Sequence, residues 1–96
     1  GVGRVSCTVD PIADGLRITA TIDLPPQSGE ETVAFEAADP RVWVSESETR
    51  RQGKTLVSVT EMVGPTGQAF ALDRSRLTLT VISAKGAVEI IGCPAP

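Results

Sequence analysis

Three cations lie within five residues of this chain, in the stretch SETRRQGKTLVSV that runs from Ser47 to Val59. Arg50, Arg51 and Lys54 come directly before an alternating run that is typical of a β-strand. Clustered cations attract acidic partners and raise the rate of encounter with them. The simpler interpretation makes residues 48–53 a charged hairpin turn that keeps a sheet edge from pairing with other chains. The residues alone leave both interpretations open.

Residues that could perform acid–base or nucleophilic chemistry are sparse. The chain contains no histidine, so a Ser–His or Cys–His pair cannot form. Glu46 and Glu48 could share one face of a strand, but two carboxylates beside a loop are more typical of a solvated face. The carboxylates lack the spacing of a calcium loop. We therefore expect no enzymatic activity, no catalytic residue, no metal site and no cofactor.

The two cysteines, Cys7 and Cys93, lie near the two ends of the chain. A β-sandwich brings its terminal strands together, and a small domain gains stability when such strands are linked. We expect a Cys7–Cys93 disulfide and therefore an oxidising compartment. The alternative is a pair of unlinked, buried thiols in a cytosolic protein.

Charge and hydropathy limit the classes of partner. The formal net charge is −3, which disfavours general affinity for nucleic acid because that affinity requires clustered cations. No apolar run reaches 18 residues, so we expect no membrane insertion. The first residues are too few and too polar for a secretory signal, and an exported protein would here be in its mature form. The length, 96 residues, indicates a single domain over residues 1–96.

Short β-strands must position these residues. Val, Ile and Thr account for 27 of the 96 residues, and such residues suit pleated, half-buried surfaces. Pro25-Pro26, Asp39-Pro40 and the Gly64–Gly67 stretch interrupt the alternating runs. The pattern predicts an all-β, immunoglobulin-like antiparallel β-sandwich of seven or eight short strands, with a small barrel as the alternative. We expect strands over residues 4–10, 16–24, 32–37, 41–47, 54–63, 68–72, 76–83 and 87–93.

Two further features could contribute to binding. Arg17, Thr19 and Thr21, together with Thr78 and Thr80, predict a polar sheet face, although rows of threonine are usually only solvated. Trp43 alternates with Val42 and Val44, and a single tryptophan in such a chain most often belongs to the core. We therefore expect Trp43 to be buried and the two valines to be half-exposed.

The stretch SETRRQGKTLVSV, followed by RLTLTVISAKGAVEI and a proline-containing tail, resembles the small periplasmic chaperones of curli biogenesis, the CsgC and CsgH types. In that family a polar stretch leads into a KTL-like strand, and a hydrophobic strand, a short glycine turn and a final strand precede a Pro-rich tail. DGLRITATIDL also fits the second strand of the family. The resemblance lies in pattern and spacing and covers most of the chain. In this sequence the matching elements are the polar stretch with its strand, the hydrophobic strand, the glycine turn, and the final strand with its tail, at residues 47–59, 76–83, 84–86 and 87–96.

One departure separates the two types. The C-type members carry a Cys-x-Cys pair after the second strand, whereas this chain has QSGEE at residues 27–31 and no cysteine there. A redox role linked to that pair does not transfer, and the H type is the better comparison.

The resemblance implies an immunoglobulin-like fold, a periplasmic location and inhibition of premature amyloid assembly by curli-type subunits. It also implies action at low ratios to the client through transient electrostatic contact. The client would first meet Arg50, Arg51 and Lys54, with Arg17 and Arg76, and also Arg74, as neighbours if the sheets bring them together. We expect a monomer whose partners are amyloidogenic curli-type subunits.

Two other functions compete with this hypothesis. One is an adhesive or structural module of a larger secreted protein. The other is an inhibitor or carrier that binds another exported protein through loops such as residues 25–31 or 64–67.

Overall fold

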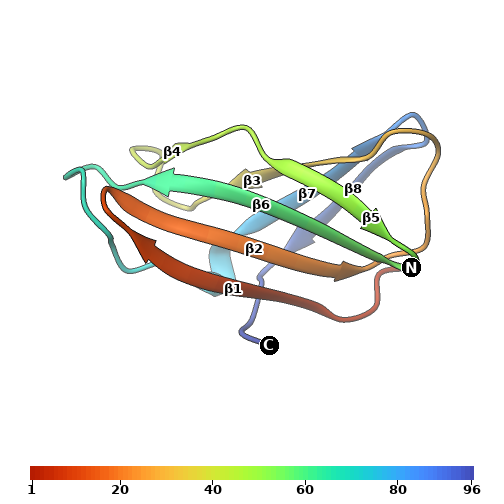
Figure 1. Cartoon of the computed structure of the whole chain (residues 1–96), viewed down its shortest axis with the longest axis horizontal. Coiled ribbons are helices and arrows are strands. Elements are labelled where there is room, and N and C mark those ends of the chain that lie inside the picture. Colours follow the sequence, from red (N-terminus) through yellow and green to blue (C-terminus); the bar gives the residue numbers. More distant parts are fainter.

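Two antiparallel β-sheets pack against each other around a single apolar core (Figure 1). The structure is a computed structural model that describes every residue from Gly1 to Pro96. The larger sheet has the order β1-β2-β6-β4, and β5 also pairs with β6; the smaller sheet has the order β3-β7-β8. A short 3-10 turn, η1, precedes β7. The bounds are β1 Val5–Ile12, β2 Gly15–Asp23, β3 Thr32–Glu36, β4 Trp43–Val44, β5 Glu48–Gln52, β6 Thr55–Val63, η1 Arg74–Arg76, β7 Thr78–Ser83 and β8 Gly86–Ile91.

Strict alternation along β2 forms the centre of the larger sheet. Even-numbered residues from Leu16 to Ile22 are buried, and odd-numbered residues from Arg17 to Asp23 are exposed or half-buried. This confirms the predicted inward set. Gly15 begins β2 beside the end of β6, and a Cβ atom there would lie only 1.8 Å from the carbonyl oxygen of Met62. Because glycine has no side chain, the backbone at the start of β2 can lie against the backbone at the end of β6.

Aliphatic side chains from both sheets fill the space between them. Val33 and Phe35 of β3 face Leu79 and Val81 of β7 across their shared ladder. Only one aromatic ring is among the buried residues, so the core is mainly aliphatic, as the composition indicates. The buried cluster comprises Cys7, Ile18, Ala20, Ile22, Leu24, Val33, Phe35, Leu56, Met62, Leu77, Leu79, Val81 and Cys93.

The predicted strand bounds are wrong in three places. Residues 48–52 form the strand β5 rather than a turn, and the turn shrinks to Gly53-Lys54, where Gly53 has φ +61°. Residues 68–72 form no strand. In the predicted strand 41–47, only Trp43 and Val44 pair with β6.

Trp43 is on the surface, so its expected burial is wrong. Its side chain is 61% exposed beside Val63 of β6. Val42 and Val44 instead pack against the core. The alternation does separate Trp43 from the two valines, but it is the valines that face the core. The register places Val44 beside the fully buried Met62 of β6, so Trp43, one residue earlier, points to the opposite side of the strand.

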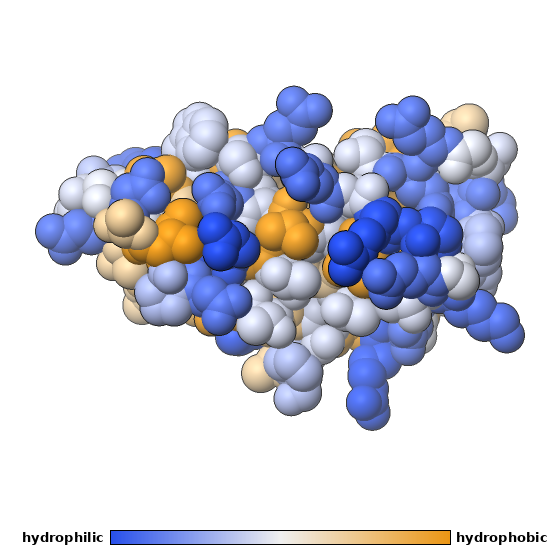
Figure 2. All heavy atoms as spheres, in the orientation of Figure 1, coloured by the Kyte–Doolittle hydropathy of each residue, from blue (hydrophilic) through white to orange (hydrophobic).

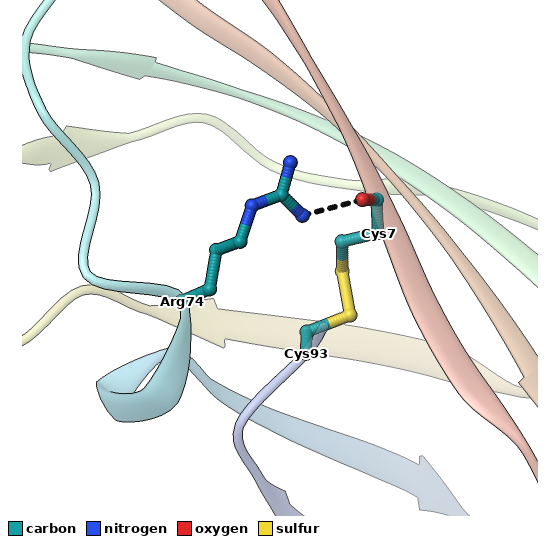
Figure 3. Close-up of a disulfide and its surroundings, with 3 residues drawn as sticks. All are labelled: Cys7, Arg74 and Cys93. Carbon is teal, nitrogen blue, oxygen red and sulfur yellow. Dashed lines mark hydrogen bonds between the residues drawn. A yellow bond between two sulfur atoms is a disulfide. The ribbon is translucent and has the colours of Figure 1, made fainter. Parts of the chain in front are cut away.

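The predicted disulfide is present and joins Cys7 of β1 to Cys93, just beyond β8 (Figure 3). Both cysteines are fully buried. The backbone N–H of Cys7 donates to the carbonyl of Pro94 at 2.8 Å, and Nη1 of Arg74 donates to the carbonyl of Cys7 at 2.6 Å. The disulfide and these hydrogen bonds attach the first strand of the larger sheet to the end of the smaller one.

Candidate binding surface

The solvent-facing side of the larger sheet, called here the outer face, carries Arg17 and Arg50, two of the cations predicted to contact a partner, together with Thr19 and Thr21. Thr78 and Thr80, predicted to share a polar face with them, lie in β7 of the smaller sheet instead. The register of β1, β2, β6 and β5 arranges its side chains in rows across the strands. Three successive rows are Ser6–Thr21–Val57–Arg50, Thr8–Thr19–Val59–Glu48 and Asp10–Arg17–Glu61.

Hydroxyl and valine side chains form the middle of the outer face, and charged side chains surround them. Figure 2 looks onto this side of the molecule and shows apolar surface only as small separate patches among hydrophilic side chains. Two shallow hollows of about 230 and 340 Å³ lie over β5 and β6, and they share Glu48 and Val59. The face is therefore exposed β surface without the large apolar patch that marks a stable interface.

Arg50 and Arg51 are separated by the strand in which they lie. Successive residues of a strand point to opposite sides of the sheet, so Arg50 lies on the outer face and Arg51 on the other side. Arg50 is exposed and forms no ion pair. The side chain of Arg51 is only 21% exposed and pairs with Glu31. Of these two predicted contact residues, only Arg50 presents a free guanidinium to a partner.

The remaining predicted cations do not form one patch. Arg17 lies on the outer face and pairs with Glu61 at 3.0 Å. The register offsets Arg17 from Arg50 by four residues along β6, about 13 Å in the strand direction, and the two residues lie in the strands on opposite sides of β6. Lys54 is exposed in the turn at the start of β6. Arg76 lines a cavity with Pro65, which follows the far end of β6, so it lies at the opposite end of the molecule from Lys54.

Arg51 connects the loop before β3 to the β5–β6 hairpin. Its Nε donates to Glu31 at 2.9 Å, and its Nη1 donates to the carbonyls of Leu24 and Gly53. Glu31 also accepts the backbone N–H of Gln27 at 3.0 Å. These hydrogen bonds, those from Arg51 above all, hold the pKa of Glu31 below its ordinary value.

Acid should weaken this connection. Because the pKa of Glu31 is lowered in the folded state, its pair with Arg51 stabilises the fold above the ordinary glutamate pKa of about 4.3. That stabilisation is lost as the pH falls through the lower, folded-state pKa. We expect denaturant midpoints of the wild type to fall between about pH 5 and pH 3 more steeply than those of Glu31→Gln. Parallel profiles would contradict the assignment.

A network of hydroxyl groups, which the sequence analysis missed, fixes the interrupted strand between β4 and β5. Thr49 and the buried Ser58 share a hydrogen bond of 2.8 Å. Thr60, also buried, donates to the carbonyl of Ser45 at 2.8 Å, and the N–H of Glu61 donates to the Ser45 hydroxyl at 2.9 Å. The sequence does contain one indication of this network, because Ser58 and Thr60 occupy inward positions in the middle of β6, where apolar residues would be expected.

A cavity of about 400 Å³ opens at the end of the molecule that carries the loops after β3 and β6. Its walls combine apolar side chains such as Phe70 and Leu72 with the guanidinium groups of Arg41 and Arg76. Arg41 is bound to Asp39 by two side-chain hydrogen bonds of 2.9 and 3.1 Å, and these lower the pKa of Asp39.

No protein-family model, curated protein or solved structure matches this chain. None of its helical segments is long and apolar enough to cross a membrane. No three Asp, Glu, Cys or His residues come together in a way that could hold a metal ion. The chain has an all-β fold of two antiparallel sheets and a disulfide that joins residues near its two ends.

Proposed function

We propose that this protein is an exported, chaperone-like inhibitor of amyloid nucleation that acts through transient contact with its outer face. The observation that carries the proposal is the combination on one face of exposed β surface with an unpaired cation, Arg50. The disulfide supports an oxidising compartment, which we take to be the periplasm. The clients would be amyloidogenic subunits of the curli type.

The strand order supports an immunoglobulin-like topology for the sandwich. Strands β1, β2, β6 and β4/β5 correspond to A, B, E and D of that fold, and β3, β7 and β8 correspond to C, F and G. The disulfide differs from the usual link between strands B and F, because it joins the first strand to the end of the last. A sandwich closed in this way would offer a rigid surface to a flexible client.

The mechanism requires encounter rather than tight binding. Amyloid grows when strands stack in register, so brief contact with early strand-rich oligomers can disfavour a nucleus. Arg50 would draw acidic client segments toward the hydroxyl rows of Thr19 and Thr21. The mixed charges around that centre would keep the contact short-lived.

The test is the fibrillation lag time of a purified curli-type major subunit, followed with an amyloid dye. Wild-type protein at about one part per hundred of client is expected to lengthen the lag severalfold, because action on nuclei needs few molecules. An unchanged lag even at equal concentrations would reject the proposal.

Charge reversal at Arg50 should weaken that inhibition. Arg50→Glu leaves the Arg51–Glu31 pair intact and is expected to alter stability by less than about 0.5 kcal/mol. Arg76→Glu is the matched control, because it makes the same charge change at the other end of the molecule. We expect Arg50→Glu to lose most of the lag extension and Arg76→Glu to keep it. Equal effects of the two variants would remove the outer face from the mechanism.

The cavity at the loop end favours a second candidate function, binding of another exported protein. Its position beside Pro65 coincides with one of the loops, residues 64–67, that the sequence singled out. A partner that is not amyloidogenic would favour this function if its binding were lost in the Arg76→Glu variant and kept in the Arg50→Glu variant.

A further inference from the structure

The edge strands of the two sheets differ in how they are protected against pairing with a strand of another chain. Along β1, the outward backbone groups of Cys7 are already bonded to Pro94 and Arg74. Alternation places Pro11 on the same side of β1, where it offers no donor. Proline and occupied backbone groups are standard protection for a sheet edge.

The facing edges of β5 and β3 are protected in other ways. Strand β5 is only five residues long, carries two arginines and is separated from β4 by the Ser45–Ser47 interruption. Strand β3 lies against this region, and the hydroxyl of Ser47 donates to the carbonyl of Val33. The outward row of β3 is therefore interrupted at Val33, and that of β5 is short and ends at the break before β4.

Strand β8 is the exception. It pairs only with β7, and it is the last strand of the smaller sheet. The N–H of Gly92 donates to the carbonyl of Leu77 on the β7 side. Along an antiparallel strand, successive residues direct their N–H and C=O groups alternately toward one neighbour and toward the other. Since Gly92 donates toward β7, the backbone groups that point away from β7 are those of Ala87, Glu89 and Ile91. None of these three residues takes part in a backbone hydrogen bond outside the ladders, and all three are exposed.

The side chains of β8 define what could pair with it. Glu89 is its only charge, and Ile91 is 70% exposed. On the opposite side of the strand, Val88 and Ile90 are partly buried against the core. The neighbouring outer positions of β7 and β3, Thr80 and Ala34, are uncharged, so nothing on that row neutralises Glu89.

We propose that the open edge of β8 binds an extended segment of a different polypeptide as a fourth strand of the smaller sheet. The segment alternates apolar residues, which cover Val88 and Ile90, with a lysine or arginine opposite Glu89. About six residues suffice, since β8 has six. Backbone hydrogen bonds supply the affinity, and the side chains supply the preference. The inference does not depend on the amyloid proposal and would stand without it.

A second copy of this chain fits the edge poorly. Two β8 strands related by a two-fold axis pair all three edge residues only when Glu89 lies opposite Glu89 of the other copy. Like charges directly opposite one another destabilise a sheet. Glu89 therefore acts against self-association and selects a basic partner segment at the same time.

The experiment uses the full, ¹⁵N-labelled chain and two capped seven-residue peptides of alternating valine and threonine, with lysine or glutamate at the centre. The lysine peptide should slow amide exchange at Ala87, Glu89 and Ile91 and bind about two- to fivefold more tightly than the glutamate peptide. Glu89→Lys should reverse that preference.

A second variant tests the backbone contribution. Ala87→Pro removes one outward N–H and leaves the bonds to β7, so it should weaken both peptides roughly fivefold. If this variant does not fold, the peptide preference of Glu89→Lys still tests the proposal. The proposal is overturned if saturating peptide leaves the three amides unprotected, if protection maps to β1 or β5, or if Glu89→Lys leaves the preference unchanged. Protection without peptide that rises with protein concentration would also overturn it, since a second copy would then occupy the edge.

Discussion

Removing the Cys7–Cys93 disulfide is expected to lower the free energy of unfolding by about 4–5 kcal/mol. The link joins residues 86 apart in sequence, so it constrains nearly the whole unfolded chain. In the chain-entropy description a loop of this length contributes close to the maximum for one disulfide. The total stability of such a domain is about 5–15 kcal/mol, so the loss would remove between about a third and nearly all of it.

Urea unfolding of oxidised and reduced wild-type protein measures this effect without any substitution. Cys7→Ala with Cys93→Ala is the matched variant, and alanine is preferred to serine because a hydroxyl at either buried site would lack a partner. Far-UV circular dichroism is the appropriate signal, because the exposed Trp43 should change its emission little on unfolding. Coincident curves for the oxidised and reduced forms would show that the link contributes nothing to stability.

Arg51→Ala is expected to be the most damaging change of a single charged residue, at about 2–4 kcal/mol. It would leave the carboxylate of Glu31, whose side chain is only 8% exposed, without its charged partner. It would also remove the donor to the carbonyl of Leu24 at the end of β2. Arg50→Ala, the neighbouring substitution, should cost less than about 0.5 kcal/mol because Arg50 is exposed and unpaired.

Denaturant midpoints for the two alanine variants test this contrast. Arg51→Met combined with Glu31→Met should recover much of the loss, because two apolar side chains leave no unpaired buried charge. Equal midpoints for Arg50→Ala and Arg51→Ala would show that the ion pair is not structural. The contrast also tests how two adjacent arginines divide their roles between partner contact and folding.

Regular alternation made much of the fold predictable. Residues 16–24 alternate without exception, and the structure places their even positions in the core. The position of Cys7 and Cys93 near the chain ends was enough to predict their link. The alternation reflects burial of one face of the strand, and the disulfide reflects the proximity of the first and last strands in a sandwich.

Strand β5 could not be found in this way, because its inward residues are polar. Thr49 bonds to Ser58, and Arg51 pairs with Glu31, so the strand lacks the apolar alternation that marks its neighbours. Those partners come from other elements of the fold and become visible only once β6 and the loop before β3 are in place. The division of the predicted cations among different surfaces follows from the same registers, which no local pattern specifies.

The disulfide also determines how the domain responds to mechanical force. Tension applied at Gly1 and Pro96 reaches Cys7 and Cys93 and passes directly through their sulfur atoms, so the loop between them carries no load. Only the few residues outside the link can be pulled straight, and fully extended they span about 30 Å in total. A chain that contained this domain would therefore transmit a pull through it without unraveling the sheets, until a reductant reached the bond.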